Sequence, residues 1–257
     1  MTAKDVYFFE HDGLRFAYRE EGQGVPILLI HGFGSSARIN WYATGWFRSL
    51  VEVGYRVIAL DNRGHGDSVK SYDPLFYIPQ AMAGDAVKLL QHLGLSKVHV
   101  MGYSMGARIS AFMALLYPAY VHSVIFGGLG IGMVTGGGDW KPVAEALLAE
   151  DVSTITNARG LMFRKFVDQT KSDRRALATC IMTSAQRLTE SDVHKIKQPA
   201  LVAVGSLDDI SGEAEPLVAL LPHGEVLEIP GRDHMLAVGD QVYKKGVIDF
   251  LSRYPIA

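Results

Sequence analysis

The chain has 257 residues, of which 48% are hydrophobic and 20% charged, so it is long enough to bury a sizeable core as one domain. Its 25 basic and 27 acidic residues give a formal net charge of −2 without a long run of either sign, which argues against nucleic acid or an anionic membrane as a partner. Because it contains a single cysteine, Cys180, it can form neither an internal disulfide nor a cysteine cluster for zinc.

Targeting signals are lacking in the N-terminal residues 1–13, which contain no long apolar stretch of the kind that a signal peptide carries. No apolar run in the sequence reaches the roughly 18 residues that a membrane span needs. We therefore expect a cytoplasmic protein whose partner is a small neutral molecule, with neither nucleic acid nor a membrane involved. Nothing in the sequence indicates an oligomeric state.

The first 128 residues alternate between segments that favour strands and segments that favour helices. A hairpin is predicted at Asp12-Gly13, a dipeptide preferred in two-residue turns. Buried strands are predicted for the apolar runs 25–30, 55–60, 97–103 and 121–128, and helices for 78–94 and 105–118. This alternation indicates parallel strands in one sheet with helices on both of its faces.

The alternation stops after Gly128. Residues 128–140 are rich in glycine and fit no regular element, and 141–195 has the pattern of helices without strands between them. A phosphate-binding loop is a poor explanation of the glycines, because neither their spacing nor a lysine matches the known motifs. Strands are again predicted at 199–206 and 224–230, and helices at 213–221 and 240–254. We predict a core domain of residues 1–128 and 198–257, with 129–197 as a helical insertion.

The segment VHVMGYSMGAR places Ser104 between two glycines, after a predicted strand and before a predicted helix. A serine at such a junction sits on a sharp turn with its hydroxyl exposed, and side chains at Gly102 and Gly106 would crowd the adjoining strand and helix. The helix that begins near Met105 directs its N–H groups toward an anion at Ser104. We predict that Ser104 is a nucleophile; the alternative is an ordinary serine in a tight turn.

A serine hydroxyl needs a base within hydrogen-bond reach, and the sequence contains nine histidines. His234 directly follows the strand predicted at 224–230, where a base is expected after the last strand, and we predict that it is the base. His31 is expected to hold its loop by hydrogen bonding. Structural positions on surfaces or in loops are expected for His11, His92, His99, His122, His194 and His223.

Two adjacent carboxylates, Asp208 and Asp209, follow the strand predicted at 199–206. One of them would orient His234 and stabilise its imidazolium, and the other would be a solvated loop residue. The spacing from Gly205 favours Asp208 as the acid and leaves Asp209 as the alternative. No carboxylate closely follows the strand at 121–128, which removes the other place for an acid.

Acyl transfer also needs two N–H donors for the oxyanion that forms on the carbonyl oxygen. The backbone N–H of Met105, the residue after the nucleophile, is predicted to be one donor. That of Phe33, in the turn after strand 25–30, is predicted to be the other. A reaction of this kind requires no metal and no organic cofactor, and we predict none.

Apolar side chains of the insertion, with two tryptophans before it, are candidates for the substrate pocket. The apolar residues of 160–167 would line an acyl pocket, although they serve equally well as the insertion's own packing face, and the tryptophans would narrow the site. The candidates are Trp41, Trp46, Trp140, Leu161, Met162, Phe163 and Phe166.

The motifs HGFG, DNRGHGDS, GYSMG, GSLDD and GRDH occur here in an order and spacing that resemble the α/β-hydrolase superfamily over nearly the whole chain. This resemblance implies an eight-stranded, mostly parallel sheet flanked by helices, with residues 129–197 as a lid over the active site. DNRGHGDS resembles the family's turn after the fourth strand, so Arg63 and His65 are expected to be structural.

The chain most resembles the small lid-bearing carboxylesterases, lactonases, carbon–carbon bond hydrolases and cofactor-free haloperoxidase relatives of that superfamily. Epoxide hydrolases and haloalkane dehalogenases of the same fold carry aspartate where this chain has Ser104, whereas hydroxynitrile lyases share the triad. We expect hydrolysis of carboxylic esters with short to medium apolar acyl groups. The alternatives are a lactonase or carbon–carbon bond hydrolase with the same triad and, from a different class, a slow-turnover small-molecule sensor.

Overall fold

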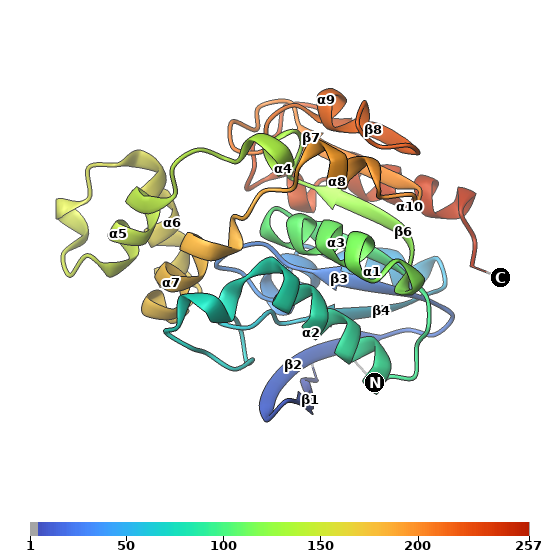
Figure 1. Ribbon diagram of the computed structural model, residues 1–257, viewed down its shortest axis with the longest axis horizontal. Helices are drawn as coiled ribbons and strands as arrows, with labels where there is room; N and C mark the ends of the chain where they lie inside the picture. The colour runs from blue at the N-terminus through green and yellow to red at the C-terminus, as the bar shows by residue number, and fades with distance from the viewer. Residues whose placement is uncertain (1–4, 257) are drawn as a thin grey trace.

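The computed structural model describes residues 5–256, which form one eight-stranded sheet with helices on both faces (Figure 1). The strands lie in the order β1-β2-β4-β3-β5-β6-β7-β8. β2 is antiparallel to β1 and β4, and the other neighbouring strands are parallel, which confirms the expected sheet. The strands are β1 (Tyr7–His11), β2 (Leu14–Glu21), β3 (Val25–Ile30), β4 (Tyr55–Leu60), β5 (Val98–Tyr103), β6 (Val121–Gly127), β7 (Ala200–Gly205) and β8 (Gly224–Ile229).

The helices alternate with the strands in the first and last parts of the chain. They are α1 (Trp46–Glu52), α2 (Pro79–His92), α3 (Met105–Leu116), α4 (Gly132–Thr135), α5 (Lys141–Leu148), α6 (Ala158–Gln169), α7 (Arg174–Ser184), α8 (Glu190–His194), α9 (Ala214–Val218) and α10 (Gln241–Arg253). Shorter turns are η1 (Ala37–Tyr42), η2 (Pro74–Tyr77), η3 (Pro118–Tyr120), η4 (Val152–Thr154) and η5 (Ala237–Gly239). Side chains that accept N–H groups at the first turn begin several helices, as Asn157 does for α6 and Asp173 for α7.

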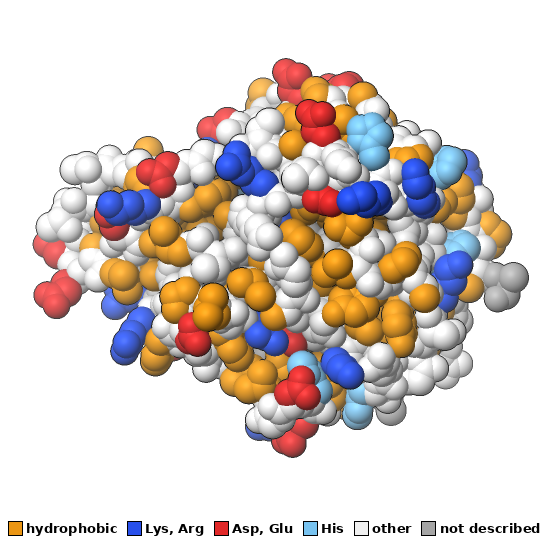
Figure 2. All heavy atoms as spheres, in the orientation of Figure 1, with side chains coloured by type: hydrophobic (Ala, Val, Ile, Leu, Met, Phe, Trp, Pro, Cys, Tyr) orange, Lys and Arg blue, Asp and Glu red, His pale blue; other side chains and the backbone are white. Residues whose placement is uncertain are grey.

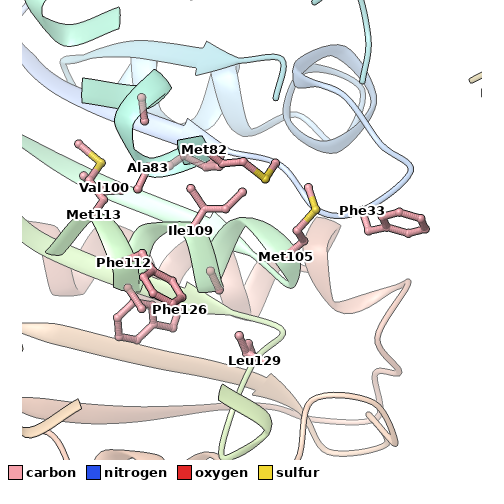
Figure 3. Packing of buried hydrophobic residues seen from close by; sticks show 14 of the residues in the cluster. Phe33, Met82, Ala83, Val100, Met105, Ile109, Phe112, Met113, Phe126 and Leu129 are labelled. Carbon is pink, nitrogen blue, oxygen red and sulfur yellow. The ribbon is translucent and has the colours of Figure 1, made fainter. Parts of the chain in front are cut away.

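Two apolar cores lie on opposite faces of the sheet, because alternate residues of each strand point to opposite sides. Leu28 of β3 belongs to the core packed against α2 and α3, part of which is seen in Figure 3. Leu29 belongs to the core packed against α1 and α10. Trp41 and Trp46 are fully buried in this second core, so the expectation that they narrow the site is wrong.

The 128–199 segment, between β6 and β7, contains α4 to α8 and, among these residues, no strand. α5, α6 and α7 pack together and project beyond one end of the sheet, at the left of Figure 1. In Figure 2 the same lobe carries Lys, Arg, Asp and Glu side chains on its outer surface. α8 instead returns to pack against α3.

A short helix, α4, lies within the glycine-rich segment where no regular element was expected. The backbone there approaches the loop after β7 closely: the N–H groups of Gly130 and Gly132 both donate to the carbonyl oxygen of Ser211 at 3.0 Å. A Cβ at Gly130 would lie 2.2 Å from the carbonyl oxygen of Glu213. The glycines therefore permit close packing of two backbones rather than a flexible linker.

His99 is fully buried, so its expected surface position is wrong. It lies in β5, which is paired on both sides and covered on both faces, and its Nδ1 is 2.7 Å from Oγ of Ser123. Burial lowers the pKa of His99 to about 4, with a smaller contribution from His122. Within residues 5–256, no helix has the length and apolar character needed to cross a membrane.

Candidate active site

Ser104 occupies a strained turn between β5 and α3. Its φ of 54° and ψ of −112° lie in a region that residues other than glycine rarely adopt. A Cβ at Gly102 would lie 2.1 Å from the carbonyl oxygen of Gly106, and a Cβ at Gly106 would lie 1.9 Å from that of Ile30. The crowding that the sequence predicted on both sides of the serine is therefore present, and only glycine fits at these two positions.

A continuous hydrogen-bonded chain links Ser104 to His234 and Asp208. Oγ of Ser104 is 2.9 Å from Nε2 of His234, and Nδ1 of His234 is 2.8 Å from Oδ2 of Asp208. The three residues follow β5, β8 and β7, so their side chains meet at the carboxyl edge of the sheet. With the histidine neutral, Nε2 accepts the serine proton while Nδ1–H donates to the carboxylate, an arrangement suited to activating a hydroxyl.

The carboxylate of Asp208 is fully buried and saturated with donors. Its Oδ1 accepts the N–H groups of Ile210 and Ser211 at 2.9 Å, and its Oδ2 accepts the hydroxyl of Ser211 at 2.6 Å. Burial acts to raise the pKa of Asp208, but the hydrogen bond and charge of His234 and the other donors outweigh it and hold the pKa below its usual value. Asp209 is exposed, so the structure brings Asp208 and not Asp209 against the histidine.

Two residues that sequence reasoning missed also contact His234. Ser211 is fully buried, and its Oγ lies 3.1 Å from Nδ1 of His234. The Tyr103 hydroxyl donates to the backbone oxygen of His234 at 2.6 Å. The only indication in the sequence that Tyr103 belongs to the site is its position next to Ser104. Nothing in the sequence distinguishes Ser211 from other serines in loops.

The loop after β3 is held by His31, as expected. Its Nε2 accepts the N–H of Asn62 at 3.0 Å, and its Nδ1 donates to the oxygen of Gly32 at 2.8 Å. Burial lowers the pKa of His31 to about 4, so the ring is neutral at physiological pH. These contacts fix the turn that carries Phe33.

Phe33 and Met105 line the same cavity as Ser104. The backbone hydrogen bonds found between residues 5 and 256 do not use the N–H of either residue. Met105 is the first residue of α3, where N–H groups have no partner within the helix. Both N–H groups are thus available to a ligand atom, as the predicted oxyanion site requires.

Two cavities meet at Ser104. The smaller, about 40 Å³, is also lined by Met105, Arg108, Leu129, Trp140, Phe163 and Ile181. The larger, about 170 Å³, is lined by Ile39, Asn40, Phe166, His234, Met235 and Val238. Phe33 and Phe163 line both cavities and contact each other edge to face, with ring centroids 5.7 Å apart.

The predicted pocket residues fall on different sides of this division. Trp140 lines the smaller cavity, Phe166 the larger, and Phe163 both. Met162 lines neither of the two and packs, partly buried, against the core cluster that also contains Phe163. The insertion's side chains therefore serve both as pocket wall and as packing face.

Arg108 is a buried cation beside the smaller cavity. Its guanidinium donates to the backbone oxygens of Gly132, Met133 and Gln186 at 2.9 to 3.0 Å. Burial lowers its pKa to about 10, so it remains charged at neutral pH. Arg108 thus ties α3, which begins at the nucleophile, to both ends of the insertion.

Other reactive groups near the site have structural roles. Arg63 makes a two-pronged, 2.6 Å ion pair with Asp85. Burial and the nearby His31 lower the pKa of His65 to about 3, and burial raises that of Cys180 to about 12. Among the described side chains, no group of three or more His, Cys, Asp or Glu residues is placed to hold a metal ion.

The sequence model of the alpha/beta hydrolase fold matches residues 25–161, more than half of the chain, and the chain belongs to this family. Non-heme chloroperoxidase CPO-A1 of Kitasatospora aureofaciens is 24% identical over 94% of this chain and 98% of its own length. Epoxide hydrolase 3 of Siraitia grosvenorii is 33% identical over 44% of this chain. The regions shared with this enzyme and two further epoxide hydrolases span 35% or less of their lengths.

Solved structures resemble the chain over nearly its full length. A hydrolase from Pseudomonas aeruginosa PA01 has a TM-score of 0.79 and 22% identity, covering 97% of this chain and 99% of its own. At this identity the likeness shows a shared fold and nothing finer. Family membership supports hydrolase activity in general. The particular reaction has to be inferred from the geometry of the site.

Proposed function

We propose that this protein is a serine hydrolase that cleaves small carboxylic esters, with Ser104 as nucleophile, His234 as base and Asp208 as the orienting acid. The observation that carries the proposal is the hydrogen-bonded chain from Oγ of Ser104 through His234 to the buried carboxylate of Asp208. It provides an activated hydroxyl next to two available N–H groups, which is the combination that acyl transfer needs.

The reaction follows from these positions. Nε2 of His234 takes the serine proton as Oγ attacks the ester carbonyl, and the N–H groups of Phe33 and Met105 face the developing oxyanion, each worth about 3 kcal/mol. His234 then gives the proton to the leaving alcohol oxygen, and the acyl group remains on Ser104. Water, deprotonated by the same histidine, releases the acid and restores the serine.

We also propose that residues 129–197 act as a lid over a core domain formed by residues 1–128 and 198–257. Support comes from Trp140, Phe163 and Ile181, side chains of this segment that line the smaller cavity beside Ser104. A cover of this kind excludes water from the acyl-enzyme until the alcohol has left.

Ester cleavage is favoured over epoxide opening by the chemistry of the nucleophile. A carboxylate that opens an epoxide forms an ester, which water can hydrolyse, whereas Oγ of Ser104 would form an ether and remain blocked. No particular contact favours a lactonase, a carbon–carbon bond hydrolase or a slow sensor, and these remain outcomes of the experiment below.

Turnover of p-nitrophenyl acetate tests the proposal. We expect many turnovers per molecule of wild-type protein, and a fluorophosphonate adduct confined to the peptide that contains Ser104. Asp208→Asn should lower kcat by about 10⁴-fold and Asp209→Asn should leave it nearly unchanged, because only the former contacts the histidine. Release of a single equivalent would indicate a sensor, and cleavage of vinylogous diketones but not esters would indicate a carbon–carbon bond hydrolase.

A further inference from the structure

We infer that this hydrolase selects esters that join a short acyl group to a larger, apolar alcohol. The inference rests on the proposed ester cleavage and adds to it the side of Ser104 on which each half of the substrate lies. Because both cavities open at Ser104 and are unequal in size, the site distinguishes the two halves of an ester.

The position of His234 determines the orientation of the ester. The leaving alcohol oxygen must come within hydrogen-bond reach of Nε2 of His234, since this atom returns the proton. His234 lines the larger cavity and is not among the residues of the smaller one. The alcohol therefore occupies the larger cavity, and the acyl chain points into the smaller one, on the side of Met105.

Size limits the acyl group. The smaller cavity holds about 40 Å³, against about 170 Å³ for the larger one, so it suits a short acyl tail such as acetyl or propionyl better than a long chain. Trp140, Phe163 and Phe33 form an edge-to-face series along it, with centroid separations of 5.8 and 5.7 Å. Figure 3 shows Met105 at the start of α3, with Leu129 on a separate segment nearby; both line this cavity.

The wall of the smaller cavity is also fixed in place. Arg108, one of its residues, is held by three backbone oxygens from the two ends of the insertion. Moving this side chain would leave a buried cation and several carbonyl groups without partners, which is costly. A longer acyl chain therefore cannot make room by displacing Arg108.

The larger cavity suits an apolar alcohol. Its volume of about 170 Å³ is bounded by Ile39, Phe166, Met235 and Val238. Burial of apolar carbon against these side chains favours binding in proportion to the area removed from water. The sequence suggested an apolar acyl pocket around Phe166, whereas the structure puts this ring on the side of the leaving group.

Two isomeric esters, pentyl acetate and methyl hexanoate, test the assignment because they differ only in which half is long. We expect kcat/KM to be about tenfold or more higher for pentyl acetate, given the discrimination that a few methylenes provide in a confined pocket. Equal values or a preference for methyl hexanoate would overturn the inference. If neither these esters nor p-nitrophenyl acetate turn over, it is the proposed function itself that fails.

Variants on each side separate the two cavities. Ile181→Ala enlarges the smaller cavity and should raise kcat/KM for methyl hexanoate relative to pentyl acetate several-fold; the milder Ile181→Val should do so to a lesser degree if the alanine variant folds poorly. Val238→Phe fills the larger cavity and should lower kcat/KM for pentyl acetate but not for methyl acetate. Leu148→Ala, on the exposed face of α5, is the matched control and should leave the preference unchanged. Unaltered preferences in both Ile181 and Val238 variants would contradict the inference.

Discussion

The hydroxyl of Ser211 donates at 2.6 Å to Oδ2 of Asp208, the same carboxylate oxygen that contacts His234. Two donors on one oxygen fix the direction in which the carboxylate faces the imidazole. Ser211 contacts Asp208 and Nδ1 of His234 but does not line either cavity at Ser104, so it acts through these two residues as a positioning residue. Its backbone oxygen also accepts two N–H groups from the start of the insertion.

Ser211→Ala should lower kcat about tenfold with little change in KM, because a hydrogen bond to a charged group is worth about 1.5–3 kcal/mol. The pKa of the Asp208 carboxylate should rise, since it loses a donor that favours its charged form, so the kcat–pH profile should fall off at a higher pH on its acid side. Ser252→Ala, on the exposed face of α10, is the control. An unchanged pH profile together with a lower kcat would assign Ser211 a purely structural role.

Ser104→Ala should reduce kcat on the order of 10⁵-fold or more while leaving the fold intact. Ser104→Gly should be equally inactive yet more stable than the alanine variant by about 1 kcal/mol, because glycine adopts a φ of 54° without strain. Urea denaturation of both variants measures the difference. Equal stabilities would mean that the turn stores no strain.

Low pH should destabilise the protein through its buried histidines. His31, His65 and His99 have folded-state pKa values of about 4, 3 and 4, below the ordinary 6.5, so between these values the unfolded chain binds more protons than the folded one. The free energy of unfolding is therefore greatest above pH 6.5 and falls as the pH drops, by about 2 kcal/mol per histidine between pH 7 and pH 5.

Urea denaturation at several pH values measures this effect. His99→Asn retains a partner for Ser123 but does not titrate, so its free energy of unfolding should fall less steeply with decreasing pH. If the free energy of unfolding of His99→Asn falls with pH as steeply as that of the wild type, His99 does not contribute to the destabilisation at low pH.

Arg108→Met should destabilise the protein by about 3 kcal/mol, because backbone oxygens of Gly132, Met133 and Gln186 lose their buried donor. Residues 129–197 should become more sensitive to limited proteolysis, since both ends of the segment are released from α3. Arg108→Lys keeps the charge and one donating nitrogen in place of two, and it should restore part of the stability. If limited proteolysis cleaves residues 129–197 of Arg108→Met no faster than those of the wild type, contacts other than those of Arg108 hold this segment in place.

The sheet and the residues around Ser104 could be predicted because the sequence patterns that determine them lie within short stretches of the chain. Strands of a parallel sheet are covered on both faces and appear as continuous apolar runs, as in β3 and β5. Ser104, Asp208 and His234 follow β5, β7 and β8 within a few residues, so the topology of the sheet places them at one edge.

Other features depend on distant segments and leave no local signal. Ser211 matters because the fold brings it within 3.1 Å of His234, 23 residues further along the chain, and Met162 packs against a core built from many segments. The wrong expectation for Trp41 has the same origin, since an aromatic residue near a motif is as often a core residue as a pocket wall. The division into two cavities depends on segments that are far apart in the sequence and meet only in the folded chain.

The backbone of Gly130 and Gly132 is hydrogen-bonded to Ser211. The insertion therefore has one part whose sequence is constrained by this contact and another part whose sequence is not. Residues 129–133 are bound on one side by the loop that carries Asp208 and on the other by Arg108. The helices α5 to α7 reach the neighbourhood of Ser104 through the side chains that line the two cavities and through Cys180, whose Sγ lies 4.0 Å from Sδ of Met105. Replacing residues 141–184 with the corresponding segment of a related protein should therefore change the substrate preference, provided that residues 129–133 and Arg108 are kept.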